Sequence, residues 1–320
     1  MTIDIHGHVT SPELFRRLPM PPSLADIDGM IEQKAALGIS TTIVGSPVGA
    51  GTMVPVPGLD NYDQPVDKLE AFHDWVGETV RAHPGSLKAY VYTNPYGGDD
   101  LLDRAAARLE QDEFVGLIVN TSVRGRFLDD RAADGFFAIA AERRAPVLLH
   151  PPAEPIGSSA VRHLGLVEHV ARPADVTLGV AAILLAGWLE RYPDLRLVVS
   201  NAGGALPLLA EKLDLARRRP AGPGPPPPAA ESPLSTEDLL RRLYVDTATP
   251  SRLALTGALS TFGADRMLFG TDSPPLATPL DAALTAIDRL PLNDSQRAGV
   301  LRGNAAALFG LDESELRKAS

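Results

Sequence analysis

Short apolar runs recur along the chain, and each is followed by a more polar segment of helical length. The runs hold five to eight residues, and several are nearly continuous in Val, Ile and Leu. Such runs are typical of parallel strands that are covered on both faces. Eight strands are predicted in this way: Ile3–His8, Thr41–Ser46, Leu87–Asn94, Val115–Asn120, Pro146–His150, Leu195–Ser200, Leu243–Thr247 and Met267–Asp272.

The segments between these runs include amphipathic stretches that predict helices. Strict alternation of strand and helix favours a parallel α/β sheet, and eight repeats favour closure into a (β/α)8 TIM barrel, distorted and with extra C-terminal helices. We therefore predict a single barrel domain over residues 1–320. The clearest predicted helices are Leu101–Leu109, Ala132–Arg143, Ala205–Arg217 and Arg252–Phe262.

An open, doubly wound sheet is the alternative arrangement for the same pattern. That fold usually carries a glycine-rich phosphate turn after its first strand. The first predicted strand ends instead in His6-Gly7-His8. This difference favours the barrel.

Proline and glycine mark segments that fit neither strand nor helix. Residues 219–233 include four consecutive prolines and predict an exposed linker within the sixth β/α unit. Val48–Tyr62 and Pro151–Asp175 follow the second and fifth strands. Both segments are expected at the carboxyl end of the barrel, where the active sites of this fold lie.

Polar side chains end most of the predicted strands. Because the carboxyl ends of barrel strands form one face, we expect these side chains to converge. They are His6, His8, Ser46, Asn94, Asn120, His150, Asn201, Asp246 and Asp272.

The first strand predicts a chelating pair of histidines. Side chains alternate along a strand, so Asp4, His6 and His8 share one face, and Ile3 and Ile5 share the other. We expect the isoleucine face to pack on helices and the other face to point into the barrel. A His-x-His pair is a weak metal signal alone, and surface histidines are the alternative interpretation.

His150 and Asp272 end two further strands and complete a candidate metal site. The alternatives are a hydrogen-bonded core histidine for His150 and a helix cap for Asp272. Three imidazoles and one carboxylate suit zinc, with Mn, Fe or Ni as other candidates. A second metal would need a bridging Lys or Glu near the end of the fourth strand, and Val115–Thr121 has neither. We therefore predict one divalent ion.

Composition narrows the classes of function. The chain has 320 residues, no cysteine and a formal net charge of −10. Thiolate metal sites and cysteine nucleophiles are therefore excluded, and a nucleic-acid partner is not expected. His73 and His83 fall in a predicted helix, where surface positions are expected. Val176–Leu189 is too short for a membrane span, so we predict a buried helix there, no membrane partner and a cytoplasmic location.

Several motifs, in this order and spacing, resemble amidohydrolase-related enzymes that include aminocarboxymuconate semialdehyde decarboxylase, γ-resorcylate decarboxylase and 6-methylsalicylate decarboxylase. The resemblance extends over nearly the whole chain. The motifs are Ile3-Asp-Ile-His-Gly-His, Val147-Leu-Leu-His-Pro, Leu189-Glu-Arg-Tyr-Pro-Asp-Leu-Arg, Ala202-Gly-Gly-Ala-Leu-Pro, Tyr244-Val-Asp-Thr-Ala and Ala264-Asp-Arg-Met-Leu-Phe-Gly-Thr-Asp-Ser-Pro.

The resemblance implies a barrel, a homodimer, and a divalent metal held by His6, His8, His150 and Asp272. It also implies small carboxylated substrates, often aromatic or unsaturated, that are decarboxylated without oxidation or, in other relatives, lactones that are hydrolysed. One position departs from the family pattern His-x-Gly-Gly. Asn201 stands where the family has its catalytic histidine.

Three hypotheses follow for the function. The first is non-oxidative decarboxylation of a small aromatic or unsaturated acid, with Asp272 relaying a proton and Asn201 facing substrate. The second is hydrolysis of a lactone or amide by a metal-bound hydroxide. The third is a non-catalytic barrel with a degenerate site. The predicted substrate-binding residues are Asn120, Arg124, Ser46 and His163.

Overall fold

Eight parallel strands form the centre of the molecule. The computed structural model describes residues 1–217, 232–276 and 279–311. Within these residues the strands follow one another around the sheet in chain order. They are β1 (Thr2–His8), β2 (Ile39–Gly45), β3 (Leu87–Tyr92), β4 (Phe114–Asn120), β7 (Pro146–His150), β8 (Arg196–Val199), β9 (Tyr244–Asp246) and β10 (Met267–Leu268).

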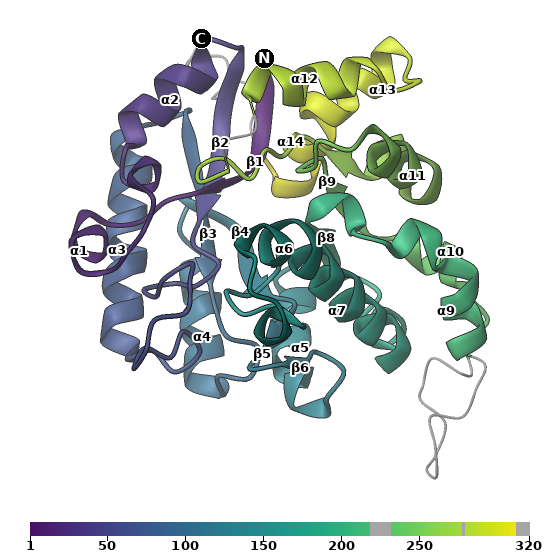
Figure 1. Cartoon of the computed structure of the whole chain (residues 1–320), viewed down its shortest axis with the longest axis horizontal. Coiled ribbons are helices and arrows are strands. Elements are labelled where there is room, and N and C mark those ends of the chain that lie inside the picture. The colour runs from purple at the N-terminus through teal and green to yellow at the C-terminus, as the bar shows by residue number, and fades with distance from the viewer. Residues whose placement is uncertain (218–231, 277–278, 312–320) are drawn as a thin grey trace.

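The sheet is nearly closed into a barrel, which confirms the predicted fold. A backbone hydrogen bond of 2.9 Å from Ile5 N to Phe269 O joins the last strand segment to the first. Helices surround the sheet, and three of them follow β10 (Figure 1). The helices are α1 (Pro12–Arg17), α2 (Ile27–Ala35), α3 (Val66–Ala82), α4 (Asp99–Arg108), α5 (Asp134–Glu142), α6 (Leu164–Leu166), α7 (Arg172–Ala186), α8 (Trp188–Arg191), α9 (Ala210–Arg217), α10 (Thr236–Leu240), α11 (Arg252–Phe262), α12 (Leu280–Asp288), α13 (Asp294–Ala298) and α14 (Asn304–Phe309).

Alternation along the strands divides the core into an inner and an outer cluster. Outward-facing side chains such as Leu149 of β7 pack with the surrounding helices. Inward-facing ones meet inside the barrel, as Leu148 does, and α14 covers one end of this cluster. The inner cluster takes at least one buried or partly buried apolar side chain from each strand: Ile3, Ile5, Ile43, Tyr90, Tyr92, Val115, Ile118, Leu148, Val198, Tyr244 and Leu268.

The structure corrects the predicted faces of β1. Ile3 and Ile5 pack inside the barrel and not on helices. Asp4 instead contacts Lys34 of α2, with 2.7 Å between the Lys34 Nζ and the Asp4 Oδ2. His6 and His8 still reach the barrel interior, because β1 holds a bulge between Asp4 and Gly7. The extra residue of a bulge re-aims the side chains that follow it.

The last predicted strand is shorter than expected. Strand pairing covers only Met267 and Leu268, and Asp272 lies in the loop beyond with a left-handed φ of 54°. Gly270 in this loop allows a close approach, since a Cβ there would lie 3.0 Å from the Asp246 Cβ and 3.1 Å from the His6 Cβ. The loop, and not a continuous strand, therefore brings Asp272 to the barrel axis.

The apolar segment predicted as a buried helix is α7, which Gly187 ends with a left-handed φ of 77°. Val176, Val180 and Leu184 of this helix are fully buried in the outer cluster. The longer helical stretch Leu164–Ala186 has 23 residues and is apolar enough to cross a membrane by composition, but half of its apolar window is buried within the protein. Packing on the barrel thus accounts for its apolar character.

Two other predictions concern His73 and the linker at residues 219–233. His73 is not a surface residue: it is buried in α3, and its Nε2 accepts a hydrogen bond from the backbone N of Tyr92 at 3.1 Å. The prediction of an exposed linker at residues 219–233 falls, except for its last two residues, outside the described part of the chain.

Candidate metal centre

Four side chains converge at the carboxyl end of the barrel. One donor atom from each of His6, His8, His150 and Asp272 lies within 4.8 Å of the others. The Asp272 Oδ1 is 2.9 Å from the His8 Nε2 and 3.5 Å from the His6 Nε2. The structure therefore brings together all four residues predicted as metal ligands, from β1, β7 and the loop after β10.

The three imidazoles are oriented by oxygen atoms on their outer sides. The Nδ1 of His6 lies 2.6 Å from the Asp246 Oδ2, the Nδ1 of His8 lies 3.2 Å from the Gly45 O, and the Nδ1 of His150 lies 2.8 Å from the Pro151 O. In each case the Nδ1–H donates, which leaves the Nε2 lone pair free for a metal ion. The donor set and its tautomers fit a divalent ion.

An unpartnered nitrogen supports the same conclusion. The Nε2 of His150 is buried and makes no hydrogen bond within the described residues. A buried polar atom without a partner costs free energy, and a metal ion would satisfy it. The three rings also lie nearly perpendicular to one another, with centroids 4.8 to 5.2 Å apart, so their nitrogens approach one point from different directions.

Burial and neighbouring charges shift the pKa values of the cluster residues in different directions. Burial lowers the pKa of His150 to about 3, which keeps this imidazole neutral as a ligand must be. Burial opposes the charged form of His6 as well, but the carboxylates of Asp272 and Asp246 outweigh it and raise the pKa to about 9, so a metal ion would displace a proton from the His6 Nε2. Although burial favours a neutral acid, the imidazoles hold the pKa of Asp272 well below its usual range.

A buried ion pair holds the loop that carries Asp272. Lys34, only 2% exposed, donates to the Asp4 Oδ2 and to the Ser273 O, each at 2.7 Å. The other oxygen of Asp4 accepts from the backbone N of Thr271 and of His6, both at 3.0 Å. One carboxylate thus ties the histidine strand to the residues on either side of Asp272.

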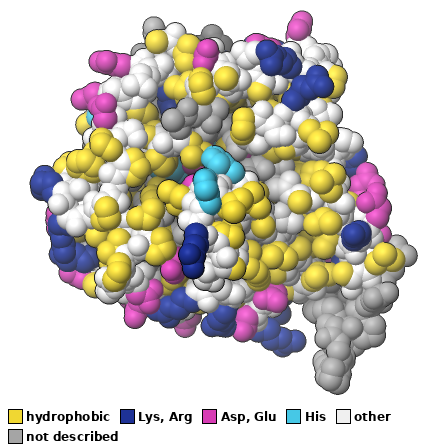
Figure 2. Space-filling model, in the orientation of Figure 1, with side chains coloured by type: hydrophobic (Ala, Val, Ile, Leu, Met, Phe, Trp, Pro, Cys, Tyr) yellow, Lys and Arg dark blue, Asp and Glu magenta, His cyan; other side chains and the backbone are white. Residues whose placement is uncertain are grey.

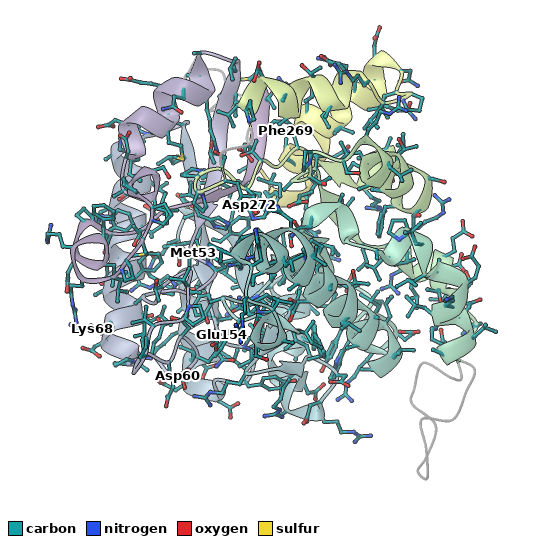
Figure 3. All side chains as sticks on the ribbon, viewed as in Figure 1. Met53, Asp60, Lys68, Glu154, Phe269 and Asp272 are labelled. Carbon is teal, nitrogen blue, oxygen red and sulfur yellow. The ribbon has the colours of Figure 1, made fainter. Side chains whose placement is uncertain are left out.

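We expect Lys34→Met to destabilise the protein by about 3–5 kcal/mol, because it leaves the Asp4 carboxylate buried without its cation. Metal affinity should fall as well, since the loop of Asp272 loses an anchor. Urea unfolding and metal titration would measure both effects. The matched control is Lys68→Met, at an exposed lysine of α3 (Figure 3). Equal stability of the two variants would show that the buried pair does not hold the loop.

A cavity of about 640 Å³ opens beside the cluster. Asp272 is 14% exposed and lines it, and Figure 3 shows this residue near the middle of the molecule. Asn201 also lines the cavity and has a left-handed φ of 54°. The other lining residues that carry polar side chains are Glu168, His169, Arg172, Thr247, Thr249, Ser251 and Thr271.

Two predicted substrate-binding residues lie buried at strand ends. Asn120 pairs in register with His150, and its Nδ2 is buried without a hydrogen-bond partner among the described residues. That unused donor sits on the neighbouring strand at the level of the metal centre. Ser46 follows β2, but its Oγ accepts a hydrogen bond from the backbone N of Val48 at 3.3 Å and so stabilises a turn.

The other two predicted substrate-binding residues have partners elsewhere in the structure. The Arg124 guanidinium is more than half exposed and forms an ion pair with Asp60. His163 is exposed, and its Nδ1 accepts from the backbone N of Gly165 at 3.1 Å at the start of α6. None of the four predicted substrate-binding residues is among the described residues that line the cavity. Partners away from the cavity therefore account for both side chains.

Sequence reasoning missed the residues that support the ligands. Asp246 was recognised only as a polar strand end, whereas it orients His6 across 240 positions of sequence. Lys34 follows Ile27 and Met30 at seven and four residues, a spacing that places it on the apolar face of α2. A lysine on such a face is the one signal that could have indicated a buried partner.

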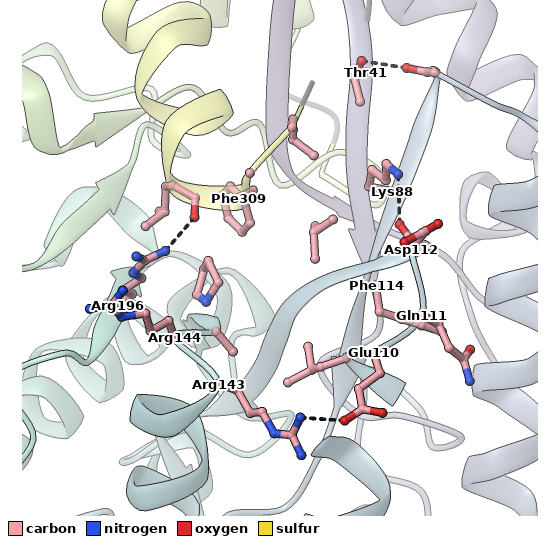
Figure 4. A pocket seen from close by; sticks show the side chains of 18 residues that line it. Thr41, Lys88, Glu110, Gln111, Asp112, Phe114, Arg143, Arg144, Arg196 and Phe309 are labelled. Carbon is pink, nitrogen blue, oxygen red and sulfur yellow. Dashed lines mark hydrogen bonds and ion pairs between the residues drawn. The ribbon is translucent and has the colours of Figure 1, made fainter. Parts of the chain in front are cut away.

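A second cavity, of about 690 Å³, lies at the opposite end of the barrel beside α14 (Figure 4). Its cations have partners: the Arg143 Nη1 lies 2.6 Å from the Glu110 Oε1, and the Lys88 Nζ donates to the Asp112 O at 2.9 Å. The histidine cluster is not there. Since barrel enzymes carry their active sites at the carboxyl ends of the strands, the first cavity is the candidate active site.

Comparisons with known proteins agree with this geometry. Residues 3–311 match the model of a family described as amidohydrolase. A 6-methylsalicylic acid decarboxylase of Penicillium expansum is 26% identical over 99% of this chain and 98% of that protein. A 2-amino-3-carboxymuconate-6-semialdehyde decarboxylase of Dictyostelium discoideum is 23% identical over 62% of this chain, a match that spans only 54% of that protein.

Solved structures share the fold. A 5-carboxyvanillate decarboxylase from Sphingomonas paucimobilis superposes with a TM-score of 0.80 and 19% identity, covering 98% of this chain and 99% of that one. A dihydroxybenzoic acid decarboxylase from Polaromonas sp. JS666, with bound manganese and the inhibitor 2-nitroresorcinol, has a TM-score of 0.76 and 20% identity, with 98% of each chain covered.

Proposed function

This chain belongs to the amidohydrolase family, and from that premise we propose that it is a metal-dependent decarboxylase that removes CO2 without oxidation from a small aromatic or unsaturated carboxylic acid. The convergence of three oriented imidazoles and one carboxylate beside an open cavity carries the proposal. Two relatives that act as decarboxylases, one of them similar over nearly the full length of this chain, support the reaction type.

His6, His8, His150 and Asp272 would hold one divalent ion through the three Nε2 atoms and a carboxylate oxygen. When bound, the ion supplies a positive charge that orients substrate oxygens and stabilises negative charge on them. We propose zinc on the basis of the donor set. Manganese is the main competitor, since a structural neighbour contains it. Elemental analysis of protein purified without added metal separates the two.

The reaction consumes one proton: R–COO⁻ and H⁺ give R–H and CO2. A C–H bond forms at the carbon that loses its carboxylate, and the electron pair of the broken C–C bond stays with the organic product. We propose that Asp272 passes this proton, because its carboxylate borders both the cluster and the cavity. The unpartnered Nδ2 of Asn120 would donate to a substrate oxygen.

We assign Asn201 a holding role at the cavity wall, since a carboxamide donates and accepts hydrogen bonds but carries no proton at neutral pH. Asn201→Ala should lower turnover by about 10- to 100-fold, as expected for the loss of one or two positioning hydrogen bonds. Steady-state CO2 release would measure this effect. A variant as inactive as Asp272→Asn would contradict the division of roles between the two residues.

The test of the function is a substrate panel with metal-loaded protein. Hydroxybenzoates and unsaturated dicarboxylic acids are followed by CO2 release, and lactones and amides are followed by release of acid. CO2 release supports the proposal, and acid release in its place would make the protein a hydrolase. The absence of both activities, together with substoichiometric metal, would indicate a degenerate site.

A homodimer and a cytoplasmic location remain predictions from the sequence and its family resemblance. A homodimer of this 33.9 kDa chain would show twice that molecular mass in sedimentation equilibrium. Analytical ultracentrifugation of the purified protein decides between the monomer and the dimer.

A further inference from the structure

A short π-helical segment, Val167–Ala171, places a histidine at the mouth of the candidate active site. His169 in this segment is exposed and lines the same cavity as Asn201 and Asp272. Its imidazole ring makes no hydrogen bond or ion pair with the described residues. Figure 2 shows histidine side chains at the surface near the middle of this face. π-Helical turns often occur at functional sites.

The other ionisable groups of the cavity are already engaged. Arg172 pairs with Glu168 through two contacts, of 2.8 Å and 3.3 Å, and a guanidinium does not give up its proton. Asp272 belongs to the metal cluster, and because a ligating carboxylate holds no proton of its own, the proton that it passes to substrate must reach it from another group. Among the described residues that line the cavity, His169 is the one histidine, the residue type that most often serves as a general acid or base.

The helix that carries His169 is anchored to both neighbouring parts of the site. The Arg172 Nη1 donates to the Pro152 O at 3.0 Å, two residues beyond the ligand His150. On the other side, the turn after Asn201 packs on the start of α7. A Cβ at Gly204 would lie 2.7 Å from the Pro173 O, so only glycine allows this approach. His169 therefore faces the cavity from a fixed segment next to Asn201.

We propose that His169 is the group through which the proton consumed in each turnover enters the active site. This inference rests on the proposed decarboxylase function. The imidazolium N–H gives up its proton toward Asp272 and substrate, and the proton ends on the carbon from which CO2 departs. The neutral imidazole then regains a proton from water, to which it is exposed. Asn201, on the same cavity wall, cannot perform this exchange.

His169→Ala should lower CO2 release by about 100-fold, at the lower end of what a proton-transfer group contributes, while bound metal stays stoichiometric. The matched control is His83→Ala, at a histidine that pairs with Asp28 at 3.0 Å and lies outside the cavity. The control should keep the parent rate. A parent rate in His169→Ala, or loss of its metal, would overturn the proposal, because His169 would then be idle or structural.

Two rescue experiments separate proton supply from simple contact. Added imidazole should restore CO2 release by His169→Ala, because the shortened side chain leaves space for it. It should not restore CO2 release by His169→Gln, because the amide fills that space. Each rate is compared with the rate of the parent at the same imidazole concentration. Asn201→His introduced into His169→Ala should restore turnover, since position 201 lines the same cavity. Failure of both rescues overturns the inference. Absence of CO2 release by the parent overturns the proposed function, and this inference with it.

Discussion

Asp272→Asn is expected to reduce CO2 release by about 1000-fold or more, within the range that loss of a proton-transfer group produces. The asparagine keeps the shape of the side chain and one oxygen near the imidazoles. It cannot accept or release a proton, and it removes the negative charge that lies 2.9 Å from the His8 Nε2. The variant should therefore retain part of its metal but lose turnover.

Steady-state CO2 release and elemental analysis on the same preparation would separate these two effects. Asp281→Asn is the matched control, because Asp281 is exposed in the first turn of α12. That control should retain the activity and metal content of the parent. An Asp272→Asn variant with a rate near that of the parent would remove Asp272 from the proton path.

His150→Ala is expected to lower metal affinity by more than about 100-fold. Loss of an outer partner of a ligand typically costs about 10- to 100-fold, and this substitution removes a ligand itself. The Nε2 of His150 makes no hydrogen bond among the described residues and lies 4.0 Å from the Asp272 Oδ1, an arrangement that a metal ion between the two atoms would explain. Turnover should fall together with the bound metal.

Competition with a chelator of known affinity would measure this loss, and excess metal should restore part of the activity. His83→Ala again serves as the control. Since β7 is paired along its length with β4 and β8, the strand should remain folded without the imidazole, and circular dichroism would verify this. Parent-like metal binding by His150→Ala would show that the cluster is not the metal site.

The convergence of the four candidate ligands, which the structure shows, could be predicted because each position follows from local pattern and fold class. His150 ends an apolar strand whose predicted bounds, Pro146–His150, match those of β7. Once eight strands are arranged in parallel, their carboxyl ends must share one face. Asn201 reached the cavity for the same reason. Strand alternation and parallel order are properties of short stretches of sequence.

The orientation of the β1 side chains could not be predicted by the same rule. Simple alternation places Ile3 and Ile5 opposite the histidines, whereas all four point inward. The bulge between Asp4 and Gly7 inserts one residue relative to β2. Pairing with a neighbouring strand decides where such an insertion lies, so the sequence of β1 alone does not specify it.

Contacts between residues that are distant in sequence could not be predicted from the sequence either. Arg124 was predicted to bind substrate, but Asp60, which is 64 positions away in sequence, engages it away from the cavity. His73 was predicted to be a surface residue, but it is buried, and its Nε2 accepts a hydrogen bond from the backbone N of Tyr92 in the adjacent strand. In each case the deciding partner is set by packing and not by spacing along the chain.

The sequence by itself therefore determined the barrel, the end of the barrel that holds the candidate site, and the four candidate donor residues that converge there. Only the tertiary structure decided how those donors are aimed and supported. Asp246 orients His6, and Asp4 holds Thr271 across 267 positions of sequence. Hydrophobic periodicity reports which face of an element is buried, because burial depends on the element's own side chains. Hydrogen bonds between distant residues depend on the positions of both partners, and those positions exist only after the barrel has closed.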